Sequence, residues 1–153
     1  MKWCFDTSAL IEPWVRLYPR DIMAPVWAKL EELAAANTIG APEEVLIELS
    51  RQQDELFEWG QGQGGMFLPP DRASIEGMKK ITNDFPGLVK TDSTKSAGDP
   101  WVISLAQIHR VPIVQYEGRA KRGAPPKIPN VCDALGIRCV TLVDVLRAEG
   151  FAL

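Results

Sequence analysis

Two acidic residues in this sequence each follow a short apolar run that is typical of a buried strand. Asp6 comes directly after residues 3–5, and Glu117 comes directly after residues 111–116. The ends of neighbouring parallel strands lie about 5 Å apart, and open α/β sheets bind ligands just beyond the carboxyl ends of their strands. If these two strands are neighbours, the two acids share one edge of the sheet.

Two further acids are candidates for the same place. Asp99 begins an apolar helix that leads into the second strand, and a right-handed crossover places the start of that helix at the same sheet edge. Glu48 has apolar neighbours on its helix, so its side chain could point inward. Several carboxylates in one cleft repel one another unless some are protonated or a cation binds. An all-oxygen site suits Mg²⁺ or Mn²⁺.

Each of these acids also has a purely structural explanation. Asp6 and Asp99 are both favoured helix N-cap residues, and Asp99 is followed by proline, which is favoured at the first helical position. Taken alone, Glu48 is explained by a solvated helix position and Glu117 by a loop position. Only the joint pattern favours a metal site.

Composition narrows the class of protein. The chain has 153 residues, 46% of them hydrophobic and 24% charged, which is typical of one globular domain with its own core. With a net charge of -3, a nucleic-acid binder would need a local basic patch. There is no bilayer-spanning apolar stretch and no signal-peptide pattern, and the three cysteines include no C-x-x-C pair. We therefore expect a cytoplasmic protein with reduced thiols and no membrane partner.

The alternation of strands and helices predicts an α/β protein: a single-domain α/β/α sandwich, residues 1–153, with a central, mainly parallel sheet. The expected strands are residues 3–5, 38–41, 111–116 and 137–140. The expected helices are residues 9–14, 21–36, 43–59 (one helix or two), 71–85, 98–109, 130–135 and 142–148. The glycine-rich stretch 60–65 follows a helix and not a strand, so we expect a hinge or flap there instead of a phosphate-binding loop.

In their order and spacing, these motifs resemble the PIN domain. The resemblance is carried by Asp6-Thr7-Ser8 after the first strand, Ile47-Glu48-Leu49, Asp99 at the start of a buried helix, and an acid after the next strand. It is closer to a PIN-like bacterial subfamily long described as a domain of unknown function. In that subfamily the helix opens with an Asp-Pro-Trp type run and the following strand ends in Glu. The run 127–132 also fits it, and the resemblance covers nearly the whole chain.

The resemblance implies a metal-dependent ribonuclease, commonly the VapC-like toxin of a toxin–antitoxin pair. The family's acidic site would fall on Asp6, Glu48, Asp99 and Glu117 as catalytic residues. Asp6, Asp99 and Glu117 would be the metal ligands. Ser8 matches the hydroxyl residue that supports the first aspartate.

We therefore expect a Mg²⁺- or Mn²⁺-dependent endoribonuclease that hydrolyses RNA phosphodiester bonds and has an antitoxin protein as partner, with a homodimer left open. The alternative is a PIN-like module that binds RNA or protein through a weakened or inactive metal site. Two departures from the PIN pattern favour it, because Glu117 replaces the usual Asp and Gln115 stands where Thr or Ser is usual. A DNA nuclease with the same chemistry is a third hypothesis.

Basic side chains near the acids are candidates for holding a polyanionic backbone, with salt-sensitive affinity. Most of them lie in the loop that follows Glu117, and one precedes Asp99. A solvated loop explains them equally well. The RNA-binding candidates are Lys95, Arg119, Lys121 and Arg122.

Overall fold

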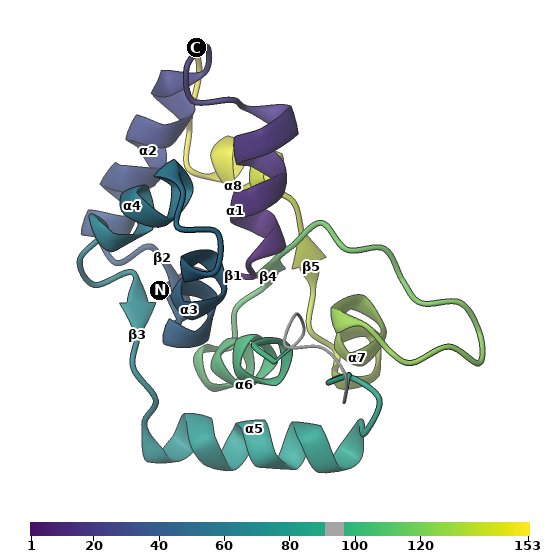
Figure 1. The fold of residues 1–153 in the computed structure, drawn as a ribbon. Helices are drawn as coiled ribbons and strands as arrows, with labels where there is room; N and C mark the ends of the chain where they lie inside the picture. The colour runs from purple at the N-terminus through teal and green to yellow at the C-terminus, as the bar shows by residue number, and fades with distance from the viewer. Residues whose placement is uncertain (91–96) are drawn as a thin grey trace.

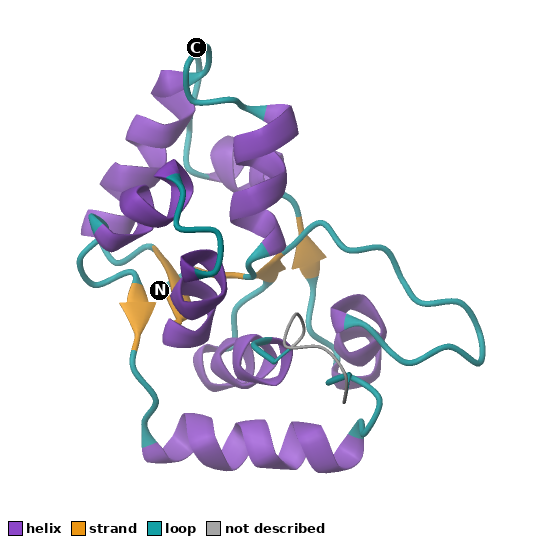
Figure 2. Cartoon of the chain, in the orientation of Figure 1, coloured by secondary structure: helices purple, strands orange, loops and turns teal. Residues whose placement is uncertain are grey.

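The structure is a computed structural model that describes residues 1–90 and 97–153. Within these residues, five strands form one parallel sheet in the order β3-β2-β1-β4-β5 (Figures 1 and 2). The first strand along the chain is therefore the central one. The strands are β1 (Trp3–Phe5), β2 (Ile39–Pro42), β3 (Phe67–Leu68), β4 (Ile113–Val114) and β5 (Cys139–Val140).

Helices cover both faces of this sheet, which confirms the predicted α/β/α sandwich (Figure 1). One side carries α1 (Ser8–Glu12), α2 (Ala24–Ala35) and α8 (Leu142–Ala148). The other side carries α5 (Arg72–Asp84), α6 (Asp99–His109) and α7 (Ile128–Leu135). The connection from β2 to β3 contains α3 (Glu43–Ser50) and α4 (Glu55–Gln61). In the described part of the chain, no helix combines the length and the apolar character needed to cross a bilayer.

Helix α6 is the most enclosed helix near the sheet edge. It packs on β1, β2 and β4 with one side and on α5 with the other, which explains why apolar residues surround most of it. The contact with α5 is close, because the buried Ser104 hydroxyl donates a 3.0 Å hydrogen bond to the carbonyl of Ser74. A Cβ atom on Gly77 would collide with Ser104 Oγ. This packing fixes the start of α6, and hence Asp99, relative to the sheet.

The two strands that precede Asp6 and Glu117 are neighbours, which is the condition for the two acids to share one edge of the sheet. Phe5 of β1 lies opposite Val114 of β4, and the Asp6 N–H donates a 3.0 Å hydrogen bond to the carbonyl of Val114. The strand before Glu117 is shorter than the predicted strand 111–116, since β4 ends at Val114. Both acids nevertheless follow strand ends at the same edge.

Several boundaries differ from the sequence prediction. For the region 43–59 the sequence left one helix or two open, and the structure has two. Gln53 adopts a positive φ of 46° between them, and Asp54 caps α4 through a 3.1 Å hydrogen bond from the Phe57 N–H. The strand β3 was not predicted, because two residues are too short to show a periodic pattern. Helix α7 begins at Ile128, two residues before the predicted start.

The first helix is also longer than predicted. Pro13 does not stop it: a π-helical segment, Pro13–Leu17, continues α1 and closes with a 2.8 Å bond from the Tyr18 N–H to the carbonyl of Pro13. A proline is tolerated there because it has no N–H to place, and the wider π turn accommodates its ring. The exposed side of this segment includes Val15.

Candidate active site

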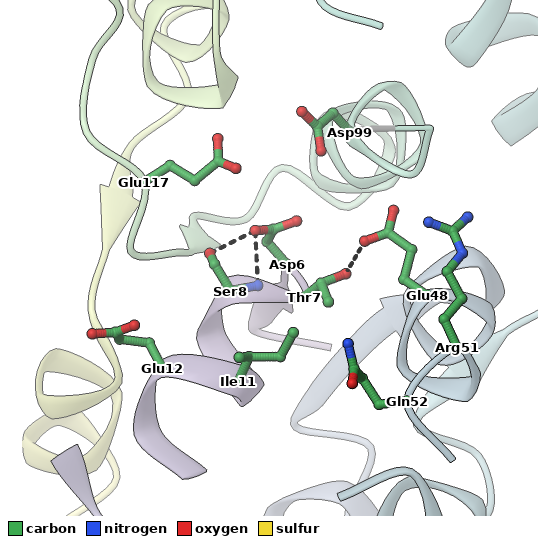
Figure 3. A pocket seen from close by; sticks show the side chains of 10 residues that line it. All are labelled: Asp6, Thr7, Ser8, Ile11, Glu12, Glu48, Arg51, Gln52, Asp99 and Glu117. Atoms are coloured by element: carbon green, nitrogen blue, oxygen red, sulfur yellow. Dashed lines mark hydrogen bonds between the residues drawn. The ribbon is translucent and has the colours of Figure 1, made fainter. Parts of the chain in front are cut away.

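A pocket of about 330 Å³ lies at the carboxyl edge of β1, and all four predicted acids line it (Figure 3). Asp6 follows β1, Glu48 comes from α3, Asp99 starts α6 and Glu117 follows β4. The structure thus brings the four residues together from four separate segments. Their convergence explains why no single motif in the sequence is strong.

Asp6 is almost fully buried, and Ser8 holds it. Oδ2 of Asp6 accepts hydrogen bonds from the Ser8 hydroxyl at 2.6 Å and from the Ser8 N–H at 3.1 Å (Figure 3). Ser8 Oγ in turn accepts a 3.0 Å bond from the Tyr116 N–H, next to Glu117. The bond from the Ser8 N–H to Asp6 resembles helix capping. Asp6 therefore stabilises the start of α1 and also faces the pocket. Burial raises the pKa of Asp6, and the hydrogen bonds from Ser8 oppose that rise.

Glu48 joins α3 to the starts of two other helices. Its Oε2 accepts a 2.7 Å bond from the Thr7 hydroxyl, and its Oε1 accepts a 3.0 Å bond from the Gly98 N–H. The purely structural explanation, that Glu48 occupies a solvated helix position, is therefore wrong. Burial raises the pKa of Glu48, while the Thr7 hydrogen bond lowers it and the Asp6 charge raises it further. Sequence reasoning missed Thr7 and Gly98 as partners, although each directly adjoins a predicted acid.

Asp99 is the first residue of α6, and Gly98 occupies the cap position. No side-chain cap hydrogen bond is present at this helix start, so the capping explanation for Asp99 is wrong. The side chain is only 6% exposed. Burial, followed by repulsion from Asp6, Glu117 and Glu48, raises the pKa of Asp99 to about 9. An uncharged carboxyl is the expected state of Asp99 at neutral pH when no cation is bound.

Glu117 is half-buried at the far side of the pocket (Figure 3). Its backbone N–H donates a 2.6 Å bond to the side-chain carbonyl of the buried Gln115, which therefore shapes the turn that presents Glu117. Burial and then the Asp6 charge raise the pKa of Glu117, while Lys127 and Lys90 lower it.

The donor set fits a hard divalent cation in its chemistry. Five carboxylates line the pocket, and none of its described lining residues is His or Cys. The four predicted acids among them all have raised pKa values. The arrangement is not a finished coordination shell, because in residues 1–90 and 97–153 no three His, Cys, Asp or Glu side chains form a group that could hold an ion. Cation binding therefore requires some carboxylates to turn toward a common point.

A second pocket of about 590 Å³ adjoins the first and shares Asp99 and Glu117 with it. Basic side chains line the second pocket, which we call the basic pocket. They are Lys90, Arg119, Lys121 and Lys127. Sequence reasoning missed Lys90, which only the path of the chain after α5 brings near Asp99 and Glu117.

The other RNA-binding candidates fare differently. The Arg119 guanidinium is paired with Asp133 and donates bonds of 2.7 and 2.9 Å to its two carboxylate oxygens. Arg122 is exposed and lines neither pocket. Lys95 lies outside the described residues.

Fold and site together define an α/β/α protein with an acid-lined pocket at the carboxyl edge of its central strands. Residues 3–153 match the family described as "Domain of unknown function (DUF4411)", and the chain belongs to this family. No curated protein and no solved structure matches the chain. The family description names no activity.

Proposed function

We propose that this protein is a divalent-metal-dependent endoribonuclease that hydrolyses RNA phosphodiester bonds. The observation that carries the proposal is the convergence of Asp6, Glu48, Asp99 and Glu117 on one pocket at the carboxyl edge of the sheet. Each of these carboxyls has a raised pKa, so the pocket favours either protons or a cation. The resemblance of the sequence motifs to PIN domains supports the same activity.

Asp6, Asp99 and Glu117 would hold Mg²⁺ or Mn²⁺, which supplies Lewis-acid activation of water and neutralises charge on the phosphate. The chain's own residues prepare this site. Ser8 fixes the orientation of Asp6, while Thr7 and Gly98 fix Glu48. Hydrogen bonds of this kind hold Asp6 and Glu48 in place and lower the cost of assembling the site.

The basic pocket supports a polyanionic substrate. Lys121 and Lys127 line it beside Asp99 and Glu117, so a phosphate backbone that crosses both pockets has its charge neutralised next to the acids. Their ammonium groups act as exposed point charges and suit a backbone read without regard to base sequence.

The test is cleavage of labelled single-stranded RNA, with DNA of the same sequence in parallel. Wild-type protein with Mn²⁺ is expected to cut RNA, and EDTA is expected to stop it. Asp6→Asn and Asp99→Asn should each lose about 100-fold or more, since loss of outer-shell support alone typically costs 10–100-fold. Glu58→Gln, which removes an exposed acid of α4, is the matched control and should retain activity. Equal activity in Asp6→Asn and Asp99→Asn would reject the site.

A second readout does not depend on turnover. Mn²⁺ or Mg²⁺ in the millimolar range is expected to raise the melting temperature, because a ligand present at about 100 times its Kd stabilises the folded state by about 2.7 kcal/mol. EDTA should reverse the shift, and Asp99→Asn should remove most of it. A melting temperature that is flat across the titration would argue against cation binding.

The biological setting we propose is that of a cytoplasmic toxin neutralised by an antitoxin protein. The rim of the acid pocket offers an exposed apolar residue, Ile11, and Val15 and Ile47 are exposed nearby in sequence to pocket residues. An antitoxin that covered these side chains would remove their apolar surface from water. Expression of the chain alone is expected to arrest growth, and Asp99→Asn is expected not to. Growth that is unaffected by active enzyme would exclude the toxin role while leaving the nuclease proposal intact.

One observation favours the second candidate, a module that binds RNA or protein without cutting. The described residues hold no preassembled metal group, and a weakened site would also lack one. The same assay separates the two candidates. Saturable RNA binding that yields no product in the presence of Mn²⁺, together with no Mn²⁺ binding by calorimetry, would establish the module.

A further inference from the structure

Two of the three cysteines of the chain lie together where α7 meets the sheet. Cys132 belongs to α7, and Cys139 is the first residue of β5. Gly136 caps the end of α7 with a positive φ of 68°, and the Ile137 N–H donates a 2.9 Å hydrogen bond to the carbonyl of Cys132. This tight turn directs the chain from the helix straight into β5, which therefore starts close to Cys132 (Figure 1).

The two thiols are in contact. The Cys132 thiol donates a hydrogen bond to the sulfur of Cys139. Cys132 is part of the buried core, and Cys139 packs against that core while part of its surface stays accessible. Both are free thiols in the structure. Two sulfurs in contact, on segments that a tight turn connects, are placed to form a disulfide with little movement of the backbone.

The contact makes the two thiols chemically different. The hydrogen bond from Cys132 lowers the pKa of Cys139, and the Arg119 charge acts in the same direction. Burial and the Asp133 charge oppose this change. The same hydrogen bond, followed by burial, raises the pKa of Cys132. Because the thiolate is the form that attacks an oxidant, Cys139 is the nucleophile of the pair and Cys132 is the resolving thiol.

We propose that Cys132 and Cys139 form a reversible oxidation site, at which a hydroperoxide converts the two thiols into an intramolecular disulfide. The Cys139 thiolate attacks the peroxide, the O–O bond breaks, and Cys139 becomes a sulfenic acid while the other oxygen leaves as an alcohol or as water. The Cys132 sulfur then attacks the Cys139 sulfur, the S–O bond breaks, and the leaving hydroxide takes the Cys132 proton to form water. The thiols lose two electrons and two protons, and the peroxide accepts them.

Cys4 is the internal control for this chemistry. It lies on the central strand and is fully buried, and its thiol donates a 3.6 Å hydrogen bond to the carbonyl of Val102. Burial raises the pKa of Cys4. With neither access for an oxidant nor a thiolate to react, Cys4 is expected to stay reduced.

The experiment treats the whole chain with hydrogen peroxide, blocks the remaining thiols with an alkylating reagent, and maps tryptic peptides of the monomer by mass spectrometry. Trypsin cuts after Lys127, Arg138 and Arg147. The two cysteines of the pair therefore fall in separate peptides, 128–138 and 139–147, which only a disulfide keeps together.

These two peptides are expected to be recovered as one cross-linked species that lacks two hydrogen atoms, and dithiothreitol should release them. The Cys4 peptide, residues 3–16, should carry the alkyl group instead. Recovery of the two peptides only as separate species, alkylated or over-oxidised, would overturn the proposal. A cross-link found only in a disulfide-linked dimer would also contradict it.

Two variants test which cysteine reacts first. In Cys132→Ser the sulfenic acid of Cys139 has no resolving thiol, so dimedone should label the peptide 139–147 after peroxide treatment. In Cys139→Ser the buried Cys132 should remain unlabelled. Label on Cys132 but not on Cys139, or no label in either variant, would contradict the proposed order of steps. Because the readout is a mass and not RNA cleavage, the result does not depend on the proposed nuclease activity.

Discussion

The backbone N–H of Gly98 donates a 3.0 Å hydrogen bond to Oε1 of Glu48, across 50 positions of sequence. A Cβ atom at Gly98 would come within 2.5 Å of that same oxygen. The missing side chain of Gly98 therefore lets α3 and the start of α6 meet through the Glu48 carboxylate. The contact places Glu48 beside Asp99 at the pocket.

Gly98→Ala is expected to disturb the site more than the fold. The φ angle of Gly98 is -79°, which alanine adopts freely, and the atom that must move is the end of a flexible side chain. The free energy of unfolding should therefore fall by about 1 kcal/mol or less. Displacement of Glu48 should weaken Mn²⁺ binding by about 10-fold or more, measured by calorimetry.

Gly64→Ala is the control for this substitution, since a Cβ there meets nothing within 4 Å. It is expected to bind Mn²⁺ as wild type does. Unchanged Mn²⁺ affinity in Gly98→Ala would show that Glu48 does not need its observed position.

Ser8→Ala is expected to weaken the connection between Asp6, which follows β1, and Tyr116, which follows β4. The Ser8 hydroxyl donates to Asp6 and accepts from the Tyr116 N–H, so its removal leaves two groups without that partner. The free energy of unfolding should fall by about 1–3 kcal/mol, measured by urea denaturation. Ser50→Ala removes a hydroxyl bonded to the Ile47 carbonyl at an exposed helix position and should cost less. A cost for Ser8→Ala no larger than that of Ser50→Ala would contradict the anchoring role.

The pKa of Asp99 predicts how stability depends on pH in the absence of metal. The pKa rises from 3.8 to about 9 in the folded chain, so the folded state holds this proton more tightly than the unfolded state does. The Asp99 contribution to the free energy of unfolding is therefore lost progressively as pH rises from about 4 to about 9. In EDTA, wild type should lose stability over this range. Asp99→Asn should lose less and should be the more stable protein at the alkaline end.

Urea unfolding at several pH values across that range checks this expectation, with Asp84→Asn as the control for an exposed acid. Parallel stability curves for wild type and Asp99→Asn would mean that Asp99 is ionised in the folded chain at neutral pH.

Lys127→Gln is expected to weaken RNA binding more than Arg119→Gln does. Lys127 lines the basic pocket and acts on Glu117, whereas the Arg119 guanidinium is already bonded to Asp133. If Lys127 contacts one phosphate, its loss should reduce the slope of log K against log salt by about 0.7 for a single strand. Binding is measured by fluorescence anisotropy in the Asp6→Asn background, which avoids cleavage. A larger effect of Arg119→Gln would place the RNA on the other side of the loop.

Local patterns in the sequence determined the architecture and the order of strands and helices that carry the acids. The apolar runs before Asp6 and Glu117, with a helix leading into the second run, predict strands of a parallel sheet, because a right-handed crossover helix joins parallel strands. The structure shows that these two strands are neighbours. The sequence left open whether residues 43–59 form one helix or two, since hydrophobic periodicity does not show a positive φ such as that of Gln53.

Tertiary structure alone decided how the acids are held and which basic residues face them. The hydrogen bond from Thr7 to Glu48 spans 41 positions, and the pairing of Arg119 with Asp133 and the approach of Lys90 to Glu117 depend on where loops and helices pack. Hydrophobic periodicity records which side of an element is buried, but it carries no information about which polar partners meet across elements. For that reason the sequence determined which carboxylates come to this edge, and only the fold determined their partners.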